Sequence, residues 1–395
     1  MAKGYAAEEG GMQTYAEGVA EAYAEAGAEV TVFTQTALGP RHMRVGPVAL
    51  VDVGRPKSPL MPLRLRAAMR RERARNGTPF LVHGTTWRTS ILPMLAGLPY
   101  VTTFHGREFM YGGTRTRQLM RMVARRARAI VTVSGYSAAK LRARLGDDLP
   151  EPIVAWNGLG DSPADCTAQG SSAENDPPLI FSLCRLEPRK NISACVRALA
   201  ELRDQGLPFR YIIGGRGPAL AEVQQLVEDC ALGDMVEVAG FMPAERVAAL
   251  YAQADIFLHP QIEIDDGRDF EGFGIAIADA MVAETAVVLG KAGGAIELVD
   301  SGVNGIAVDG TDHEELREAL RHLLAHPAER RAMAEAARAH ALRTFRWDRH
   351  IALILRGLDA DVSAAEVDWL PPARLGTPGY AGAAGYEPAL VRPVE

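Results

Sequence analysis

The chain has 395 residues, of which 43 are Lys or Arg and 49 are Asp or Glu, giving a formal net charge of −6. This length predicts two domains, each with its own core. The content of 48% hydrophobic and 23% charged residues excludes a disordered or collagen-like chain. The mild acidity of the whole points to neither a nucleic-acid-binding nor a membrane protein.

The charge is distributed unevenly along the chain. Residues 1–150 carry 22 basic and 11 acidic side chains, whereas residues 151–395 carry 21 basic and 38 acidic ones. Opposite charge in the two halves indicates a chain of two parts and favours an anionic partner for the first part.

Cysteine usage and hydropathy give no sign of export or of membrane insertion. The cysteines form no C-x-x-C pair and no metal-ligand spacing, which predicts reduced thiols. Residues 1–11 lack the apolar stretch of a signal peptide, and no apolar run reaches the roughly 18 residues of a transmembrane helix. We therefore expect a cytoplasmic protein, with peripheral contact at the inner face of the cell membrane as an open alternative.

Short β-branched runs alternate with segments that carry apolar residues at three- and four-residue spacing, as in residues 14–26, 138–145, 192–205 and 244–253. The runs are apolar on both sides, which is typical of parallel strands covered by helices on both faces. The pattern predicts an α/β fold of two doubly wound domains. The expected strands are 29–34, 79–83, 100–104, 129–133, 152–155, 179–183, 209–213, 236–239, 255–258, 286–289 and 305–308.

Three segments depart from this alternation. Residues 159–178 are mostly small and polar and indicate a linker, and residues 361–395 form a Pro/Gly-rich tail. At the start, only nine residues precede Gly10, and they do not resemble the buried strand that normally comes before a first glycine loop. We therefore expect about six to ten further apolar residues upstream in the natural chain.

Glycines and cations mark points where a strand is followed by a helix. Gly10 and Gly11 open the first expected helix, where backbone N–H groups can approach an anion, although an ordinary turn fits equally well. In the second half, Arg185 and Lys190 flank a strand-to-helix turn, so both can reach one anion such as a diphosphate leaving group. The alternative is two solvated cations. Gly215 ends the next strand and permits close approach of a nucleotide.

The densest group of candidate residues is 271–281. Glu271 and Asp279 are eight positions apart, hence on roughly the same face of about two helical turns. Asp279 lies among Ala and Ile, and a charge in such a setting requires partners. The backbone amides before this helix face an anion, and they belong to Gly272, Phe273 and Gly274.

An acidic loop, residues 261–270, comes directly before Glu271. Three interpretations are open. The loop can be a divalent-metal site, a solvated surface loop, or a contact for an amino sugar or another cationic acceptor group. The solvated loop is the favoured interpretation.

Six motifs then follow one another in an informative order and spacing: CRLEPRKN, IIGGRGP, YAQADIFLHP, EGFGIAIADAM, GGAIELV and SGVNGIAV. With TFHG at 103–106, they resemble the retaining glycosyltransferases of family 4 (GT4) over about residues 10–360. That family has the GT-B fold, in which two Rossmann-like domains face each other across a cleft that binds a nucleotide sugar.

The resemblance implies a division of the chain. It implies an acceptor-side domain, a linker, a nucleotide-sugar-binding domain, a helix that crosses back to the first domain, and a tail. Their expected ranges are 1–158, 159–178, 179–345, 346–360 and 361–395.

The resemblance also implies roles for particular residues. Arg185 and Lys190 would hold the donor diphosphate, Glu271 the donor sugar, and Asp279 the ribose hydroxyls. His105 would reach the transferred sugar or the acceptor. The remaining donor-binding positions would be Gly10, Gly11, Gly215, Gly272, Phe273 and Gly274.

The expected reaction is transfer with retention, by same-face attack in which the departing phosphate helps to take the acceptor proton. The resemblance implies no metal and no cofactor besides the nucleotide-sugar co-substrate. Replacing Arg185 or Lys190 with Ala is expected to abolish transfer and to leave the fold intact. The chain departs from the family pattern with Asp279 in place of a glutamate and with Glu284 and Ala286 in place of a glycine and a proline.

Two arginine-rich stripes, 62–75 and 115–128, account for much of the basic charge. Such helices can lie on an anionic membrane, which fits a lipid-linked hydroxyl acceptor, or they can be solvated faces. No nucleic-acid partner is expected, because the first half shows no RNP-like motif or zinc finger. The competing functions are a sugar-nucleotide epimerase and a nucleotide-dependent binding protein without catalysis.

Overall fold

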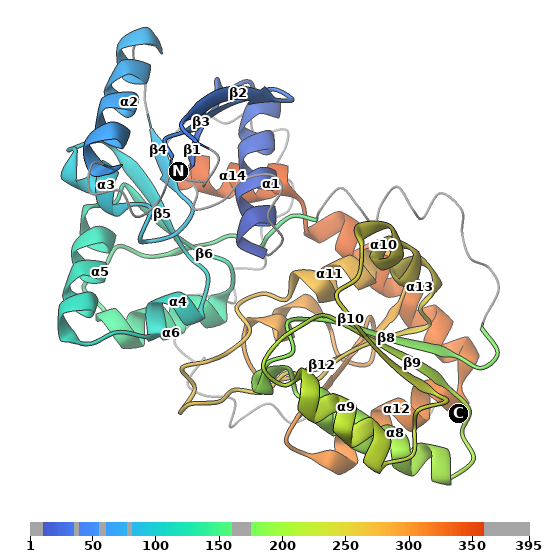
Figure 1. Cartoon of the computed structure of the whole chain (residues 1–395). Coiled ribbons are helices and arrows are strands. Elements are labelled where there is room, and N and C mark those ends of the chain that lie inside the picture. The colour runs from blue at the N-terminus through green and yellow to red at the C-terminus, as the bar shows by residue number, and fades with distance from the viewer. Residues whose placement is uncertain (1–10, 35–38, 55–60, 77–80, 160–174, 359–395) are drawn as a thin grey trace.

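The computed structural model describes residues 11–34, 39–54, 61–76, 81–159 and 175–358. Within these ranges the first and second halves of the chain form two lobes (Figure 1). Gly10, most of the expected linker, the expected tail and the question of an earlier strand lie outside the described residues.

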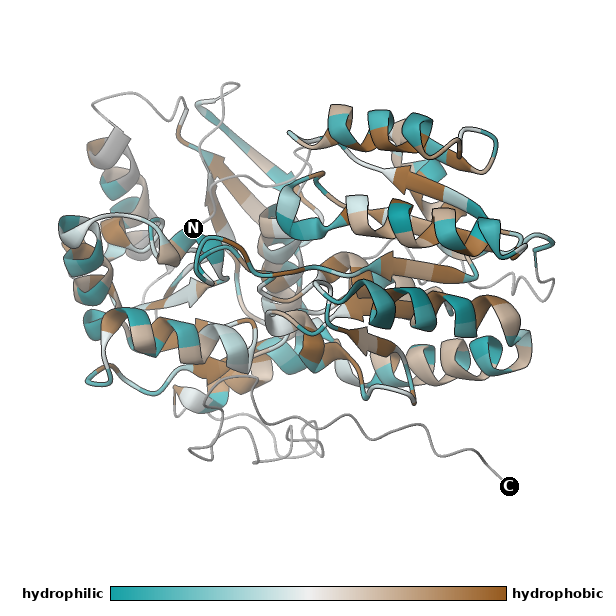
Figure 2. Ribbon diagram, turned by 90° about the horizontal axis from the view of Figure 1, so that it is seen from below, coloured by the Kyte–Doolittle hydropathy of each residue, from teal (hydrophilic) through white to brown (hydrophobic). Residues whose placement is uncertain are grey.

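The second domain is built on a six-stranded parallel sheet with the order β10-β9-β8-β11-β12-β13. A core cluster lies on each face of this sheet, and its strands are predominantly hydrophobic (Figure 2). Burial on both faces explains why the inner strands of this sheet appear in the sequence as continuous apolar runs. All six strands lie within one residue of their expected bounds. The strands are β8 (Leu179–Leu183), β9 (Arg210–Gly214), β10 (Val236–Gly240), β11 (Ile256–His259), β12 (Ala286–Gly290) and β13 (Ile306–Val308).

Four of the described helices of this domain connect consecutive strands, and the last two follow β13. They are α8 (Ile192–Asp204), α9 (Leu220–Asp229), α10 (Ala244–Gln253), α11 (Ile275–Val282), α12 (His313–Ala325) and α13 (Pro327–Thr344), with the short 3-10 helices η1 (Pro188–Lys190) and η2 (Gly294–Leu298).

The first domain contains two sheets, with the orders β1-β3-β2 and β4-β5-β6-β7. All pairs are parallel except the β2–β3 hairpin, and both of its strands lie outside the expected strand ranges. β2 is largely exposed and therefore shows no apolar run. The strands are β1 (Thr31–Thr34), β2 (Arg41–Val45), β3 (Val48–Asp52), β4 (Val82–Gly84), β5 (Tyr100–Phe104), β6 (Ala129–Thr132) and β7 (Ile153–Val154); the helices are α1 (Gly11–Glu25), α2 (Met61–Asn76), α3 (Ile91–Leu95), α4 (Arg107–Met110), α5 (Thr114–Arg126) and α6 (Gly135–Leu145).

The strand order of the second sheet reverses between β8 and β11. Ligands of open α/β sheets bind outside the carboxyl ends of the strands at such a switch point. β8 leads directly into residues 184–191, and β11 ends at His259. The topology therefore brings the expected cationic turn to the place where this sheet offers a binding site.

The chain also returns to the first domain at its C-terminal end. α14 (Trp347–Gly357) packs against α1 and β7, away from the preceding helix α13 (Figure 1). The two passages between the domains meet where Leu159 N–H donates to Phe345 O at 3.2 Å. Among the described residues, none of the helices combines the length and apolar character needed to cross a bilayer.

The start of α14 is wedged against α1. A Cβ atom on Gly18 would overlap the indole ring of Trp347. We expect Gly18→Ala to lower the free energy of unfolding by about 1–3 kcal/mol, because overpacking forces side chains or backbone to shift. Urea unfolding would measure this change. Gly233→Ala is the matched control, since a Cβ there meets nothing within 4 Å; equal stability of Gly18→Ala and wild type would contradict the packing argument.

Candidate active site

The turn after β8 and the end of β11 together place three groups around one carboxylate. Glu271 Oε2 accepts from Arg189 Nη1 at 2.8 Å and forms a close ion pair with Lys190 Nζ. His259 Nε2 lies 3.5 Å from the same oxygen and 3.2 Å from Lys190 Nζ. The side chain of Lys190 is only 9% exposed and that of Glu271 14%. The cluster therefore brings charged groups with little solvent exposure to the point where the strand order of the sheet reverses.

The protonation of this cluster follows from its charges. Burial alone would raise the pKa of Glu271, but Lys190, His259 and Arg189 together hold it well below its usual range. Burial and the Lys190 ammonium lower the pKa of His259 to about 4. At neutral pH the carboxylate is therefore ionised and the imidazole neutral.

The two predicted diphosphate-binding cations do not share a partner. Lys190 is buried against Glu271, whereas the side chain of Arg185 is 72% exposed, with its Nε 3.3 Å from Glu187 Oε1. Arg189, for which the sequence predicts no role, is the second cation on Glu271. The backbone conformation of η1 determines that the side chains of Arg189 and Lys190, and not that of Arg185, point toward Glu271. The spacing of these residues in the sequence does not indicate this orientation.

A charged network links this cluster to the first domain. Arg189 Nε lies 3.4 Å from Glu187 Oε2 and 3.2 Å from Asp269 Oδ1. Arg107, at the start of α4, reaches the same two acids at 3.3 and 3.5 Å. Burial raises the pKa of Asp269, and the charges of Arg189 and Arg107 oppose that rise. The two domains are therefore joined by charge directly beside Glu271.

His105 lies at the carboxyl end of β5, facing the second domain. Its Nε2–H donates to Thr85 O at 2.7 Å, and its ring lies edge-on to Tyr15 with the centroids 4.6 Å apart. Its backbone oxygen occupies the space that a Cβ atom on Gly272 would fill. The structure thus brings the two expected catalytic segments, around His105 and Glu271, into backbone contact.

The glycine loop before α11 depends on similarly close backbone approaches. Gly274 has a left-handed φ of 94°, and Gly294 N–H donates to Glu271 O at 2.7 Å. The side chain of Phe273 is buried in the core, with its ring centroid 5.7 Å from that of Phe345. Its contribution to a ligand is therefore limited to the backbone, as expected from the sequence.

The remaining predicted positions lie around this loop. Asp279 is on α11 near Tyr251, whose pKa is raised by burial and further by the Asp279 charge. Gly11 begins α1, and a Cβ there would lie 3.4 Å from Ile275 Cδ1 of α11. Gly215 is required for packing, because a Cβ there would overlap Cys184 O, and its N–H donates to Gly240 O at 2.7 Å.

The acidic loop 261–270 is engaged with the first domain. Lys140 Nζ lies 3.4 Å from Glu263 Oε2, and burial raises the pKa of Glu263 to about 7. Phe270 is buried in the first-domain core beside Phe109 and Tyr136. The interpretation as a solvated loop is therefore wrong for this part of it. Within the part of the chain that the structure describes, no three His, Cys, Asp or Glu side chains form a group suited to a metal ion.

One departure from the family pattern has a structural cost. Glu284 adopts a left-handed φ of 61°, a conformation that glycine adopts without strain, and its carboxylate pairs with Arg338 at 3.3 Å. Glu284 thus adopts an unfavourable backbone conformation, and its side chain forms an ion pair that joins the chain after α11 to α13.

Comparison with protein families covers most of both domains. Residues 9–159 match the model "Glycosyltransferase Family 4", and residues 167–340 match the model "Glycosyl transferases group 1". The chain belongs to glycosyltransferase family 4. Membership in GT4 confirms the resemblance on which the expected domain arrangement was based.

The relatives and solved structures similar to this GT4 chain are named for different sugars. A "GDP-mannose-dependent alpha-(1-6)-phosphatidylinositol monomannoside mannosyltransferase" of Mycolicibacterium smegmatis is 32% identical over 62% of the chain, which covers 66% of that protein, just under two thirds of its length. Sucrose-phosphate synthase from Thermosynechococcus elongatus superposes with a TM-score of 0.71 at 21% identity, covering 91% of this chain and 96% of that one. Anabaena HepE, solved with UDP and glucose, gives 0.68 at 19% identity over 89% and 98%. These structures confirm the GT-B fold.

Proposed function

We propose that this GT4 protein is a retaining glycosyltransferase that moves a sugar from a nucleotide-sugar donor to a hydroxyl acceptor. The observation that carries the proposal is the buried cluster of Glu271, Lys190, Arg189 and His259 at the switch point of the second sheet. It supplies cationic charge where a diphosphate leaves, and it adjoins His105 of the opposite domain.

In this proposal the residues of the site have separate roles in the transfer. Lys190, with Arg185 at the rim, offsets the charge that develops on the departing diphosphate. Glu271 orients the donor sugar, and Asp279 holds the ribose. The bond from the anomeric carbon to the phosphate oxygen breaks while the acceptor oxygen bonds to the same face. The acceptor proton passes to the departing phosphate, so no protein base is needed.

A donor screen followed by a transfer assay tests this function. Thermal shift against UDP-, GDP-, dTDP- and ADP-sugars would identify the nucleotide, since ligand at about 100 times its Kd stabilises the fold by roughly 2.7 kcal/mol. The screen takes both GDP and UDP because the mannosyltransferase and HepE differ in nucleotide. Transfer of radiolabelled sugar to an acceptor is expected. Conversion of the donor to an epimer, or binding without turnover, would contradict the proposal.

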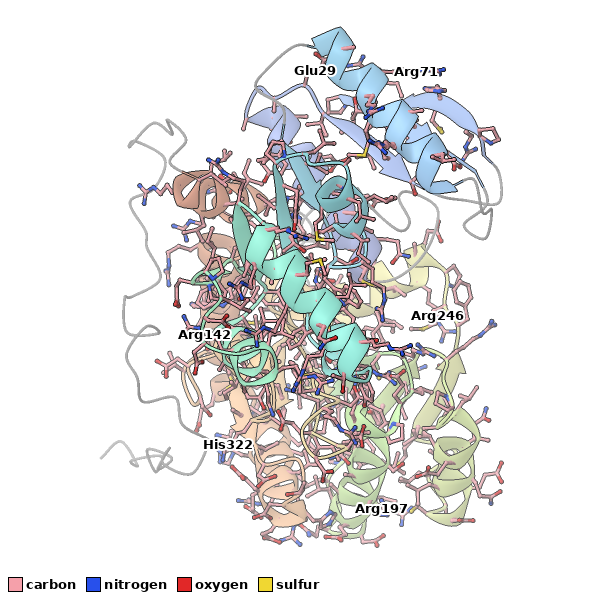
Figure 3. All side chains as sticks on the ribbon, turned by 90° about the vertical axis from the view of Figure 1, so that its left-hand side faces the viewer. Glu29, Arg71, Arg142, Arg197, Arg246 and His322 are labelled. Carbon is pink, nitrogen blue, oxygen red and sulfur yellow. The ribbon has the colours of Figure 1, made fainter. Side chains whose placement is uncertain are left out.

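We also infer that the acceptor is lipid-linked and that the first domain rests on an anionic membrane surface. We call this surface the α2–α3–α5 face, because α3 contacts both α2 and α5. Figure 3 views the molecule from this side, with α5 in front and Arg71 of α2 pointing outward. Exposed arginines and exposed apolar side chains occur together on these helices, a combination suited to headgroups and acyl chains. The residues are Arg66, Arg70, Arg71, Arg115, Arg117, Arg125 and Arg126 around Leu63, Leu95 and Met122.

Charge reversal on α5 should release the protein from membranes. Replacing Arg115, Arg117 and Arg126 with Glu is expected to weaken binding to vesicles containing phosphatidylglycerol by about 100-fold, at roughly 1 kcal/mol for each arginine. Cosedimentation at low and high salt would measure this. The control carries the same charge change on exposed residues of the second domain: Arg197, Arg210 and Arg343. Equal binding of both triple variants would remove the basis for the membrane orientation.

The proposed reaction uses no metal ion. Arg189 and Lys190 provide positive charge at Glu271, and the acidic loop directs Glu263 and Asp269 at Lys140 and Arg107 of the first domain. We expect EDTA to change the transfer rate by less than about twofold, whereas removing an essential metal would abolish it. Loss of activity in EDTA that Mn²⁺ or Mg²⁺ restores would overturn this expectation.

A further inference from the structure

One carboxylate of the second domain accepts three hydrogen bonds from the first. Glu297, on η2, accepts at Oε2 from Gly135 N–H at 3.0 Å and from Trp156 Nε1–H at 2.9 Å, and at Oε1 from Tyr136 N–H at 2.8 Å. Burial raises the pKa of Glu297 to about 6, and the hydrogen bonds from Trp156 and Gly135 oppose that rise. The side chain is therefore mostly ionised at neutral pH and can accept all three.

The N-terminus of α6 is complete only when the second domain is in place. The first N–H groups of a helix lack partners within the helix and attract negative charge. Ser134 Oγ caps α6 by accepting from Ser137 N–H at 3.0 Å. The N–H groups of Gly135 and Tyr136 are instead satisfied by Glu297. The cap is thus shared between two domains.

This cap is connected to both sides of the candidate active site. On the first-domain side, Ser137 Oγ–H donates to His105 O at 3.3 Å. On the second-domain side, Gly294 starts η2 and donates its N–H to Glu271 O at 2.7 Å. Glu297 therefore holds together the two short segments that carry His105 and Glu271.

We propose that Glu297 is a positioning residue that fixes the position of the second domain relative to the first. Sugar transfer then depends on Glu297, whereas binding of the donor does not. The inference rests on the proposed glycosyltransferase function for its kinetic consequence, but the shared cap itself can be measured without catalysis. Donor binding is spared because the cation cluster around Glu271 lies entirely in the second domain.

The test uses Glu297→Gln, which keeps the shape but turns one acceptor oxygen into an amide NH₂ that faces N–H donors. We expect kcat to fall about tenfold, since small displacements between reacting groups are costly, while the Kd for the nucleoside diphosphate that the donor screen identifies stays within about twofold by calorimetry. Hydrogen exchange in a peptide spanning residues 134–145 should increase. Trp156→Phe removes a single hydrogen-bond donor to Glu297 and should cause a smaller fall in kcat and a smaller increase in exchange. This variant replaces Glu297→Gln in the test if Glu297→Gln folds poorly.

The matched control is Glu315→Gln, because Glu315 pairs with Lys291 and accepts from Asp309 N–H wholly within the second domain. It should leave kcat and exchange in the α6 peptide unchanged. Unaltered kcat and exchange in both Glu297→Gln and Trp156→Phe would overturn the inference, and so would a loss of nucleotide affinity parallel to the loss of kcat. A wild-type protein without transfer activity would count against the proposed function, and the exchange measurement would then decide the role of Glu297 alone.

Discussion

Replacing Lys190 with Ala is expected to lower kcat/KM for sugar transfer by about 10³-fold, because a buried cation at a site of developing negative charge contributes several kcal/mol to the transition state. Lys190 is 9% exposed and contacts both Glu271 and His259. Its removal leaves Arg189 to hold the Glu271 carboxylate, which lets the fold persist. Initial rates with the donor found by the screen would measure the loss.

Two further variants serve as comparisons for Lys190→Ala. Lys291→Ala removes a lysine paired with Glu315 in the same domain and should leave the rate unchanged. Arg185→Ala should reduce transfer less than Lys190→Ala does, because Arg185 is largely exposed. A Lys190→Ala protein that is folded and still transfers at nearly the wild-type rate would refute the assignment of the cation cluster.

Replacing Gly272 with Ala is expected to reduce kcat by about 100-fold, the scale at which a displacement of 1 Å affects catalysis. The added Cβ would overlap the backbone oxygen of His105, which belongs to the other domain and cannot rotate away. The domains must therefore separate locally, and His105 moves away from Glu271. Stability should fall as well, because this separation disturbs the apolar contacts that join the domains, such as those of Phe270 in the first-domain core.

The measurement pairs single-turnover rates with calorimetric nucleotide binding. Binding should persist in Gly272→Ala, because the cations around Glu271 are unaffected. Gly113→Ala is the control in the first domain, where a Cβ meets nothing within 4 Å. A normal kcat for Gly272→Ala would show that transfer does not require the backbone contact with His105.

The sequence predicted the second domain better than the first for a physical reason. Strands β8, β9, β11 and β12 are buried on both faces, and this burial appears directly as apolar runs. β2 lies at the edge of a small sheet with four of its five residues exposed, so its residues Arg41–Val45 carry no such signal. The hairpin it forms with β3 could not be distinguished from a loop.

The candidate site was predictable in its composition and less so in its geometry. Glu271 and Lys190 were found because strand-to-helix turns at the carboxyl edge of a sheet are binding positions. Arg189 was not, because the orientation of three consecutive residues depends on η1. His259 ends β11 and carried a signal that was available, a polar residue closing an apolar strand. Glu297 could not be found, since its partners lie in the other domain.

The hydrogen bond between Leu159 and Phe345 has a mechanical consequence. It joins the outgoing and the returning chain passages, so the two covalent connections between the domains are held together at one place. We therefore expect any relative motion of the domains to be a rotation about that place. Such a rotation would change the contacts between the domains, including that of Gly272 with His105 and that of Phe270 with the first-domain core.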